Sequence, residues 1–192
     1  MKKSLTLLVD MDDTIENLLE SWLHILNKNY GFFVTPDMVT SWNIPEFYPG
    51  LNEKAVYAPL FTDELWRDIK PRWDAVKYLK MLHDDGHDIY IVTSSNFRTI
   101  GTKVESILHS YFPFIRDDHV IVAAKKPMIR GDVMIDDAPH NLEGGEYDKV
   151  LVTAPHNRTY HAEEHGMRRV DNWAQVYSWI TELAELEEKC NG

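Results

Sequence analysis

Short runs of consecutive apolar residues are the feature that most limits how this chain can fold. Four runs stand out, at residues 5–9, 89–92, 133–135 and 150–152, and a weaker fifth lies at residues 120–122. Most of these runs are continuously apolar, without alternating polar residues, which is typical of strands that are covered on both faces. The sequence therefore predicts a parallel sheet.

The segments between these runs carry helical spacing. Ala75, Leu79 and Leu82 recur at helical intervals before Gly86, and similar apolar patterns occupy residues 100–108 and 173–183. Strands that alternate with helices favour an α/β fold with a doubly wound parallel sheet.

One interval is much longer than the others. Residues 17–72 separate the first predicted strand from the next core helix, and they contain helical segments and a turn-rich aromatic stretch at residues 42–50. We expect these residues to form a small helical cap inserted after the first strand. Residues 1–16 and 73–192 would then form the α/β core that carries the chemistry.

Charge and cysteine content limit the partners and the compartment. A net charge of −11 at pH 7 opposes binding to a nucleic acid polymer, whose phosphates are also negative. The single cysteine, Cys190, allows no internal disulfide, so a reducing cytoplasm is the expected location. No apolar run approaches the length of about 18 residues that a membrane span requires, so we expect no membrane association.

Polar residues that follow the apolar runs form a second pattern. In open α/β sheets, ligands bind outside the carboxyl ends of the strands, so side chains placed there are considered together. The residues at or near these ends are Asp10, Asp12, Thr93, Ser94, Lys126, Asp136 and Asp137. Alone, each is an ordinary turn, cap or surface residue. Together they predict a cleft in which carboxylates surround one ammonium group.

This set of side chains suits a metal-assisted phosphoryl transfer. Clustered carboxylates repel one another unless a cation lies between them, and Mg²⁺ prefers oxygen ligands. The sequence has no paired cysteine or histidine set of the kind that zinc requires. Phosphoryl transfer itself needs a nucleophile, neutralisation of charge, and a proton for the leaving oxygen.

Each of these roles has a candidate residue. Asp10 is the expected nucleophile, which would form an aspartyl-phosphate, and Asp12 would protonate the leaving oxygen and then activate water. That role requires surroundings that keep Asp12 protonated near neutral pH, well above the ordinary aspartate pKa of about 3.9. Thr93 would donate a hydrogen bond to the phosphate, and Lys126 would offset the charge of Asp10 and the phosphate.

The motifs resemble those of the haloacid-dehalogenase-like (HAD) superfamily, whose core is Rossmann-like. The matching residues, in family order, are Asp10-Met11-Asp12-Asp13-Thr14, Thr93, Lys126 and Asp136-Asp137. Further pieces at residues 49–55, 92–94, 131–137 and 152–157 are similar to the 5'(3')-deoxyribonucleotidases. The resemblance implies Mg²⁺ ligands from the Asp10 carboxylate, the Asp12 backbone carbonyl and Asp137, with Asp136 in support. It implies phosphate contacts from Thr93, Ser94 and Lys126, with Lys125 as the alternative lysine.

In the family, aromatic residues of the cap hold the nucleobase. The candidates here are Trp42, Phe47, Tyr48, Phe61 and Trp66. Asp13 stands where relatives often carry glycine, and Leu18 stands where some carry a base-stacking phenylalanine. Base preference and selectivity for the 2'-deoxy sugar therefore stay open.

The resemblance implies a Mg²⁺-dependent phosphomonoesterase that dephosphorylates nucleoside or deoxynucleoside monophosphates. Two alternatives stay open: a phosphatase for another small phosphomonoester such as a sugar phosphate, and a non-catalytic binding protein on the same scaffold. The expected partner is a small molecule, and the oligomeric state is left open, with a homodimer as one alternative. His156 follows a predicted strand at the ligand end of the sheet, so an approach to the site stays open, and we favour the interpretation as a surface loop residue.

Overall fold

The computed structural model describes residues 3–191, with side chains described up to residue 186. The side chain of Cys190 lies outside the described residues. The core is a six-stranded sheet in the order β3-β2-β1-β4-β5-β6, and every pair of neighbours is parallel. Its strands are β1 (Thr6–Val9), β2 (Asp88–Thr93), β3 (Val120–Val122), β4 (Val133–Asp136), β5 (Asp148–Val152) and β6 (Met167–Val170). The predicted parallel sheet is confirmed.

Strand β6 was missed by the sequence analysis. It lies at one edge of the sheet, and its central residues Arg168 and Arg169 are not buried. An edge strand tolerates charged side chains that a central strand would exclude, so β6 lacks the apolar run that identified the others.

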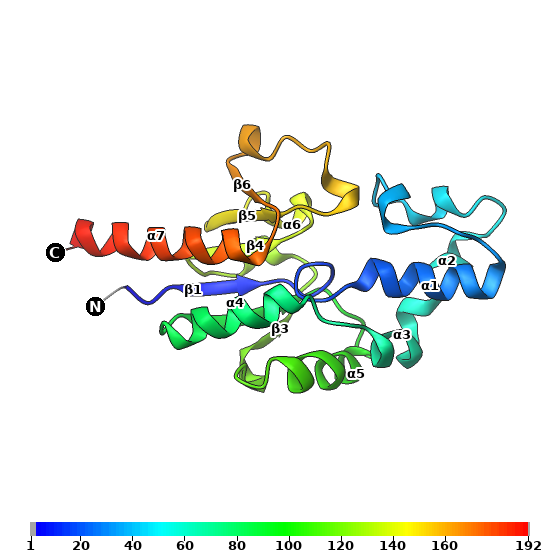
Figure 1. Cartoon of the computed structure of the whole chain (residues 1–192), viewed down its shortest axis with the longest axis horizontal. Helices are drawn as coiled ribbons and strands as arrows, with labels where there is room; N and C mark the ends of the chain where they lie inside the picture. The colour runs from blue at the N-terminus through cyan, green and yellow to red at the C-terminus, as the bar shows by residue number, and fades with distance from the viewer. Residues whose placement is uncertain (1–2, 192) are drawn as a thin grey trace.

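Helices cover both faces of the sheet, as the predicted doubly wound fold requires (Figure 1). On one face, Val133 and Ile135 share an apolar cluster with side chains of α4 (Trp73–Asp84) and α7 (Trp173–Asn191). The same face receives α5 (Ile100–Lys103), which continues as a π-helix at Val104–His109. On the other face, Met134 and Leu151 pack with Leu142 of α6 (Pro139–Leu142).

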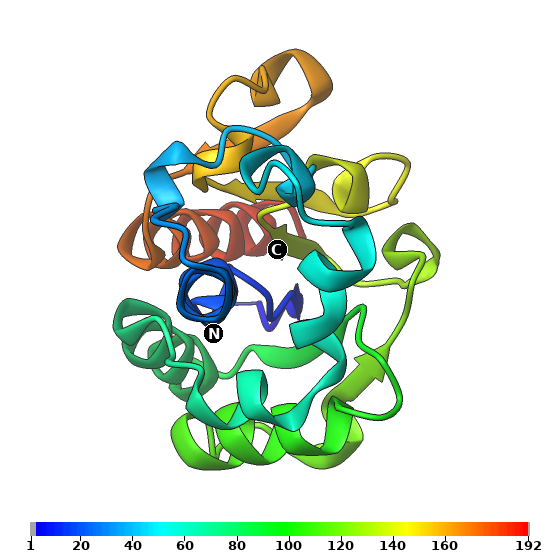
Figure 2. The same cartoon turned by 90° about the vertical axis from the view of Figure 1, so that its right-hand side faces the viewer.

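A helical insertion lies beyond the carboxyl end of β1 (Figure 1). It contains α1 (Leu18–Tyr30), α2 (Glu53–Tyr57) and α3 (Asp63–Asp68), and Trp22 of α1 donates a hydrogen bond of 2.8 Å to the carbonyl of Val56. Figure 2 looks onto this insertion with α1 seen end-on. Short 3₁₀-helices complete the described chain at Pro36–Met38, Ile44–Phe47, Ala58–Phe61, Asp117–His119, Lys126–Met128, Pro155–Asn157 and Ala162–His165.

The two chain segments that connect the insertion to the core lie side by side. Glu16 and Pro71 form an antiparallel bridge, the amide of Asn17 bonds to the Lys70 carbonyl at 2.9 Å, and the amide of Arg72 bonds to the Ile15 carbonyl at 2.8 Å. The insertion therefore leaves and rejoins the core at one place, next to the end of β1.

The strand order places the end of β1 beside the end of β4. From β1 the chain adds β2 and β3 on one side, and it then returns to add β4, β5 and β6 on the other side. Open α/β sheets bind ligands at the point where the strand order reverses in this way. The amide of Asp10 donates a hydrogen bond of 2.9 Å to the Ile135 carbonyl, so the residues that follow the two strands are neighbours. No described helix is both long and apolar enough to span a bilayer.

Candidate active site

The loop after β1 is held in a tight turn. The amide of Ile15 bonds to the Met11 carbonyl at 2.9 Å, and Asp13 has a positive φ of 52°, which aspartate tolerates better than most residues. The Asp13 carboxylate accepts a hydrogen bond of 2.9 Å from the amide of Leu19 in the first turn of α1. These contacts fix the backbone that carries Asp10 and Asp12.

Three carboxylates meet at the ends of β1 and β4. Oxygen atoms of Asp10, Asp136 and Asp137 lie within 4.8 Å of one another, and all three residues are buried. Lys126 is also buried, and its ammonium group donates hydrogen bonds to Asp10 and, at 2.7 Å, to Asp136. Its neighbour Lys125 is exposed. We call these four residues the β1/β4 cluster.

Carboxyl groups outnumber ammonium groups in this cluster. Burial raises the pKa of Asp10 well above its usual range, against the opposing effect of Lys126, and burial with Asp136 does the same for Asp137. The carboxylates in turn raise the pKa of Lys126, although burial alone would lower it. A further positive charge would relieve the repulsion among the carboxylates.

The donor set fits a hard divalent cation. Both oxygens of Asp136 already have partners, namely Lys126, the Ala138 amide at 2.8 Å and the Asn141 side chain at 3.1 Å. By contrast, Oδ2 of Asp137 is buried and makes no hydrogen bond within the described residues, although Nε2 of His156 lies 2.9 Å away. An all-oxygen set with such an unused carboxylate atom matches the preference of Mg²⁺.

His156 is not the surface residue that the sequence suggested. It is buried, its Nε2 lies 2.9 Å from Oδ2 of Asp137, and its ring centroid lies 3.7 Å from that of Trp42 in the insertion. Burial lowers its pKa, so the ring is neutral near pH 7. The 3₁₀-helix after β5 carries His156 inward, and Asn157 holds this segment by donating a hydrogen bond of 2.7 Å to the Asp137 carbonyl.

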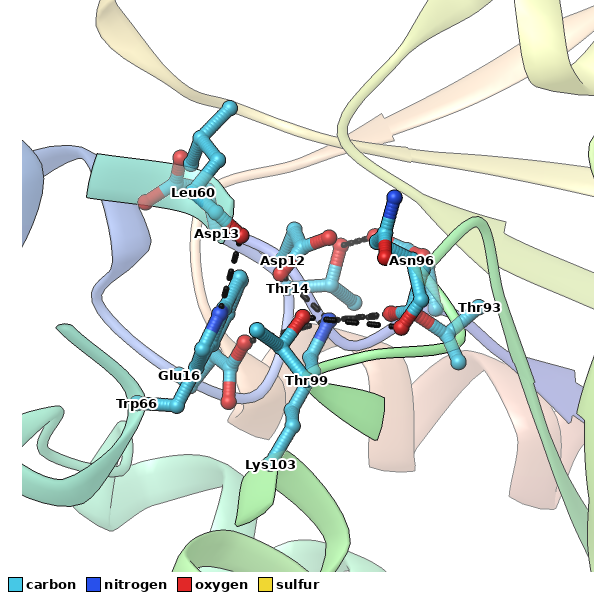
Figure 3. Close-up of polar contacts among 12 residues, drawn as sticks. Asp12, Asp13, Thr14, Glu16, Leu60, Trp66, Thr93, Asn96, Thr99 and Lys103 are labelled. Atoms are coloured by element: carbon cyan, nitrogen blue, oxygen red, sulfur yellow. Dashed lines mark hydrogen bonds and ion pairs between the residues drawn. The ribbon is translucent and has the colours of Figure 1, made fainter. Parts of the chain in front are cut away.

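A second group of charged residues surrounds Asp12, in which Lys103 and Glu16 are buried and Asp12 is partly buried (Figure 3). Nζ of Lys103 lies 2.6 Å from the Asp12 carboxylate, 3.5 Å from that of Glu16 and 3.1 Å from the hydroxyl of Thr93. We call Asp12, Glu16 and Lys103 the Lys103 cluster. Neither Glu16 nor Lys103 was predicted as a site residue from the sequence. Lys103 does share a helical face with Ile100 and Ile107, and a lysine within an apolar stripe was an available signal.

The Lys103 cluster keeps Asp12 ionised. Burial would raise the pKa of Asp12, but Lys103 and Glu16 outweigh burial and leave this pKa below its usual value. The expectation that the surroundings favour protonated Asp12 is therefore wrong for this arrangement. Burial raises the pKa of Glu16 well above its usual range, so Glu16 is more readily protonated than Asp12.

A cavity of about 330 Å³ opens beside Asp12, between the insertion and the core. That volume lies within the range of small-molecule sites. Its lining residues are Leu18, Leu60, Phe61 and Trp66 from the insertion, and Asp12, Ser94, Ser95 and Asn96 from the core.

Comparison with known proteins identifies the family. The family model described as "5' nucleotidase, deoxy (Pyrimidine), cytosolic type C protein" (NT5C) matches residues 3–186. The chain belongs to the NT5C family. It is 33% identical over 177 residues to the 5'(3')-deoxyribonucleotidase of Bacillus subtilis (strain 168), a match that spans 92% of this chain and 97% of that protein. A Clostridium acetobutylicum 5'(3')-deoxyribonucleotidase is 28% identical over 181 residues, which is 94% of this chain and 97% of that one.

Solved structures support the HAD fold of this NT5C member. The Bacillus subtilis HAD-hydrolase YfnB bound to magnesium superposes with a TM-score of 0.61 at 18% identity, over 92% of this chain and 98% of that one. A HAD family hydrolase from Deinococcus radiodurans R1, with bound phosphate and sodium, superposes with a TM-score of 0.63 at 14% identity, over 94% of this chain and 96% of that one. The chain is therefore a hydrolase of the NT5C family on a HAD-type α/β core.

The structure separates the aromatic residues that the sequence grouped as base contacts. Phe61 and Trp66 line the cavity, whereas Trp42 lies against His156 and lines a different hollow. Phe47 is partly buried against the apolar core. Tyr48 has no exposed surface, and its hydroxyl donates a hydrogen bond of 3.2 Å to Asn27. A ring without an exposed face cannot stack on a base, so Tyr48 is corrected to a packing residue of the insertion.

Proposed function

We propose that this NT5C member is a Mg²⁺-dependent phosphomonoesterase that dephosphorylates nucleoside and deoxynucleoside monophosphates through an aspartyl-phosphate on Asp10. The observation that carries the proposal is the β1/β4 cluster, in which Asp10, Lys126 and Asp137 lie together at the carboxyl edge of the sheet. The names of the curated relatives support the nucleotide as substrate.

The proposed chemistry has two steps. A carboxylate oxygen of Asp10 bonds to phosphorus, the ester P–O bond breaks, and Asp12 gives its proton to the departing oxygen. Water then attacks phosphorus and gives a proton back to Asp12, while the P–O bond to Asp10 breaks. This step returns Asp10 as a carboxylate and releases inorganic phosphate. The incoming phosphate adds negative charge beside Asp12 and so favours the protonated carboxyl that the first step needs.

The other residues of the site bind and neutralise. Mg²⁺ would be held by the carboxylates of Asp10 and Asp137 and by the backbone carbonyl of Asp12, where it would neutralise charge on the transferring group. Lys126 would neutralise charge from the opposite side, and Thr93 and Ser94 would donate hydrogen bonds to the phosphate.

We further propose that residues 17–72 act as a cap over the core formed by residues 1–16 and 73–192. Phe61 and Trp66 line the cavity from the insertion and offer aromatic surface to a nucleobase, on which bases of any identity stack. A cytoplasmic location is part of the proposal and is supported by the single cysteine of the chain.

The experiment compares wild-type protein and Asp10→Asn on a panel of dUMP, dTMP, their ribonucleotide counterparts and common sugar phosphates. With Mg²⁺, wild type is expected to release phosphate from the nucleotides, and chelation of Mg²⁺ should stop the release. Asp10→Asn should lose detectable turnover while its circular dichroism spectrum is unchanged, because an amide is a poor nucleophile.

Other outcomes would contradict the proposal. Turnover by Asp10→Asn would refute the nucleophile. Equal rates on nucleotides and sugar phosphates would favour a phosphatase that does not select a nucleobase, and no turnover of any phosphomonoester would leave a binding protein.

A further inference from the structure

Lys103 is buried with 0% of its surface exposed. The proposed chemistry gives a role to Lys126 but none to Lys103. Lysine is almost never fully buried unless it is paired, and a buried ion pair is weak support for stability because desolvation offsets its attraction. Such a pair beside the proposed acid and base of the reaction therefore calls for a reason other than stability.

The contacts of Lys103 converge on Asp12. Its ammonium group donates to the Asp12 carboxylate at 2.6 Å, and it also donates to the hydroxyls of Thr93 at 3.1 Å and Ser95 at 3.2 Å. An ammonium group offers three donors, and these three hydrogen bonds use all of them. The rotation of the Asp12 carboxyl is thereby restricted.

Glu16 and Trp66 hold the ammonium group from the other sides. The buried Glu16 carboxyl group lies 3.5 Å from Nζ. The ring of Trp66 lies over Nζ at 4.7 Å from its centroid, a cation–π contact. Glu16 comes from the segment that enters the insertion, and Trp66 comes from the insertion itself.

The helix that carries Lys103 changes from α-helical to π-helical geometry directly after this residue. Lys103 ends α5, and the chain continues directly into the π-helix Val104–His109. Single π turns within helices often occur at functional sites. The neighbouring Thr102 donates a hydrogen bond of 2.8 Å to Asp63 of α3, which fixes α5 against the insertion.

We propose that Lys103 is a positioning residue for the reaction: clamped between Glu16 and the ring of Trp66, it orients the Asp12 carboxyl toward the oxygen that leaves the phosphate. The inference rests on the proposed function. Lys103 acts through Asp12 in the step where the ester P–O bond breaks and the departing oxygen takes the Asp12 proton. Lys126 acts on Asp10 and on the phosphate group, and every substrate carries that phosphate group.

Leaving groups of different basicity separate these two roles. The nucleoside of a monophosphate leaves as a strongly basic alkoxide that needs the Asp12 proton, whereas p-nitrophenolate leaves with little need of it. The value of kcat/KM reports the steps up to formation of the aspartyl-phosphate, so hydrolysis of that intermediate does not enter the comparison. Lys103→Met and the matched control Lys126→Met are measured on dTMP and on p-nitrophenyl phosphate.

For Lys103→Met we expect a loss of about 10²-fold in kcat/KM for dTMP and of less than about 10-fold for p-nitrophenyl phosphate, the size of a general-acid contribution. Lys126→Met should lower both values by the same factor. If Lys103→Met does not fold, as judged by circular dichroism, Lys103→Met/Glu16→Gln replaces it, because that variant has no ionisable group at position 16.

Two results overturn the inference. The first is an equal loss on both substrates, which a merely structural lysine would produce, and the second is no loss on either. Absence of hydrolysis by wild type on both substrates would instead refute the proposed function. If wild type hydrolyses p-nitrophenyl phosphate but not dTMP, an alkyl phosphomonoester from the panel that it does hydrolyse replaces dTMP. The losses in kcat/KM are then compared between that substrate and p-nitrophenyl phosphate.

Discussion

Lys126 and Lys103 are both buried ammonium groups that bridge two carboxyl groups, yet they occupy different parts of the molecule. Lys126 lies between Asp10 and Asp136, within the core at the ends of β1 and β4. Lys103 lies between Asp12 and Glu16, where the core meets the insertion. The residues Asp10 and Asp12 that they contact are two positions apart in the same loop.

The two clusters balance their charges differently. Three carboxyl groups of the β1/β4 cluster face one ammonium group, and Oδ2 of Asp137 makes no hydrogen bond within the described residues. In the Lys103 cluster, two carboxyl groups face one ammonium group, and the raised pKa of Glu16 beside the lowered pKa of Asp12 makes Glu16 the more readily protonated of the two. The first cluster therefore has the larger excess of carboxyl groups, which favours an added cation. We propose the first cluster as the metal site and the second as the site that positions Asp12.

The largest expected effect is a contrast in stability. With Mg²⁺ present, Asp136→Asn is expected to lower the free energy of unfolding by about 1.5–3 kcal/mol, because Asp136 accepts hydrogen bonds as a charged group. Glu16→Gln should cost less than about 1 kcal/mol, since glutamine has the shape and charge of a protonated glutamate. Urea unfolding monitored by circular dichroism measures both. Equal costs would show that Glu16 is ionised and would break the comparison.

The second effect concerns the Mg²⁺ requirement. Asp137→Asn removes a charged oxygen from the proposed ligand set, so the Mg²⁺ concentration for half-maximal activity should rise by about 10–100-fold. Glu16→Gln, which changes the other cluster, should leave that concentration within about 3-fold of the wild-type value. Titration of activity with Mg²⁺ decides the matter. A larger shift for Glu16→Gln than for Asp137→Asn would place the metal in the Lys103 cluster and contradict the proposed ligand set.

The smallest effect is a change in the affinity for Mg²⁺ itself. Lys126→Met removes a positive charge that competes for Asp10, so Mg²⁺ should bind on the order of tenfold more tightly. Lys103→Met/Glu16→Gln should bind Mg²⁺ with nearly unchanged affinity, because neither side chain belongs to the proposed ligand set. Isothermal titration calorimetry measures both dissociation constants. Weaker binding by Lys126→Met would show that Lys126 supports the metal site and does not compete with it.

The sequence predicted the features that one element carries by itself. Continuous apolar runs predicted β1 and β4, and the residues after them predicted where Asp10 and Asp137 would lie. Strand β6 was missed because charged residues of an edge strand give no such run.

Features that depend on contacts between distant elements were not predictable from the sequence. Glu16 and Lys103 meet only after the entry to the insertion folds against α5, so no local pattern pairs them. The lowered pKa of Asp12 follows from that contact. Tyr48 and Phe61 are both aromatic residues of the insertion, and only packing places one in its interior and the other at the cavity.

The central claim is that Asp10 forms a covalent bond to the transferred phosphate, and trapping of that bond tests it most directly. Wild-type protein with Mg²⁺ and dTMP is quenched in acid during turnover and reduced with borohydride, which converts an aspartyl-phosphate to homoserine. Peptide mass spectrometry then identifies the position of the homoserine. We expect homoserine at position 10 that depends on both Mg²⁺ and substrate. Homoserine at position 12, or its absence from position 10 while phosphate is being released, would contradict the account.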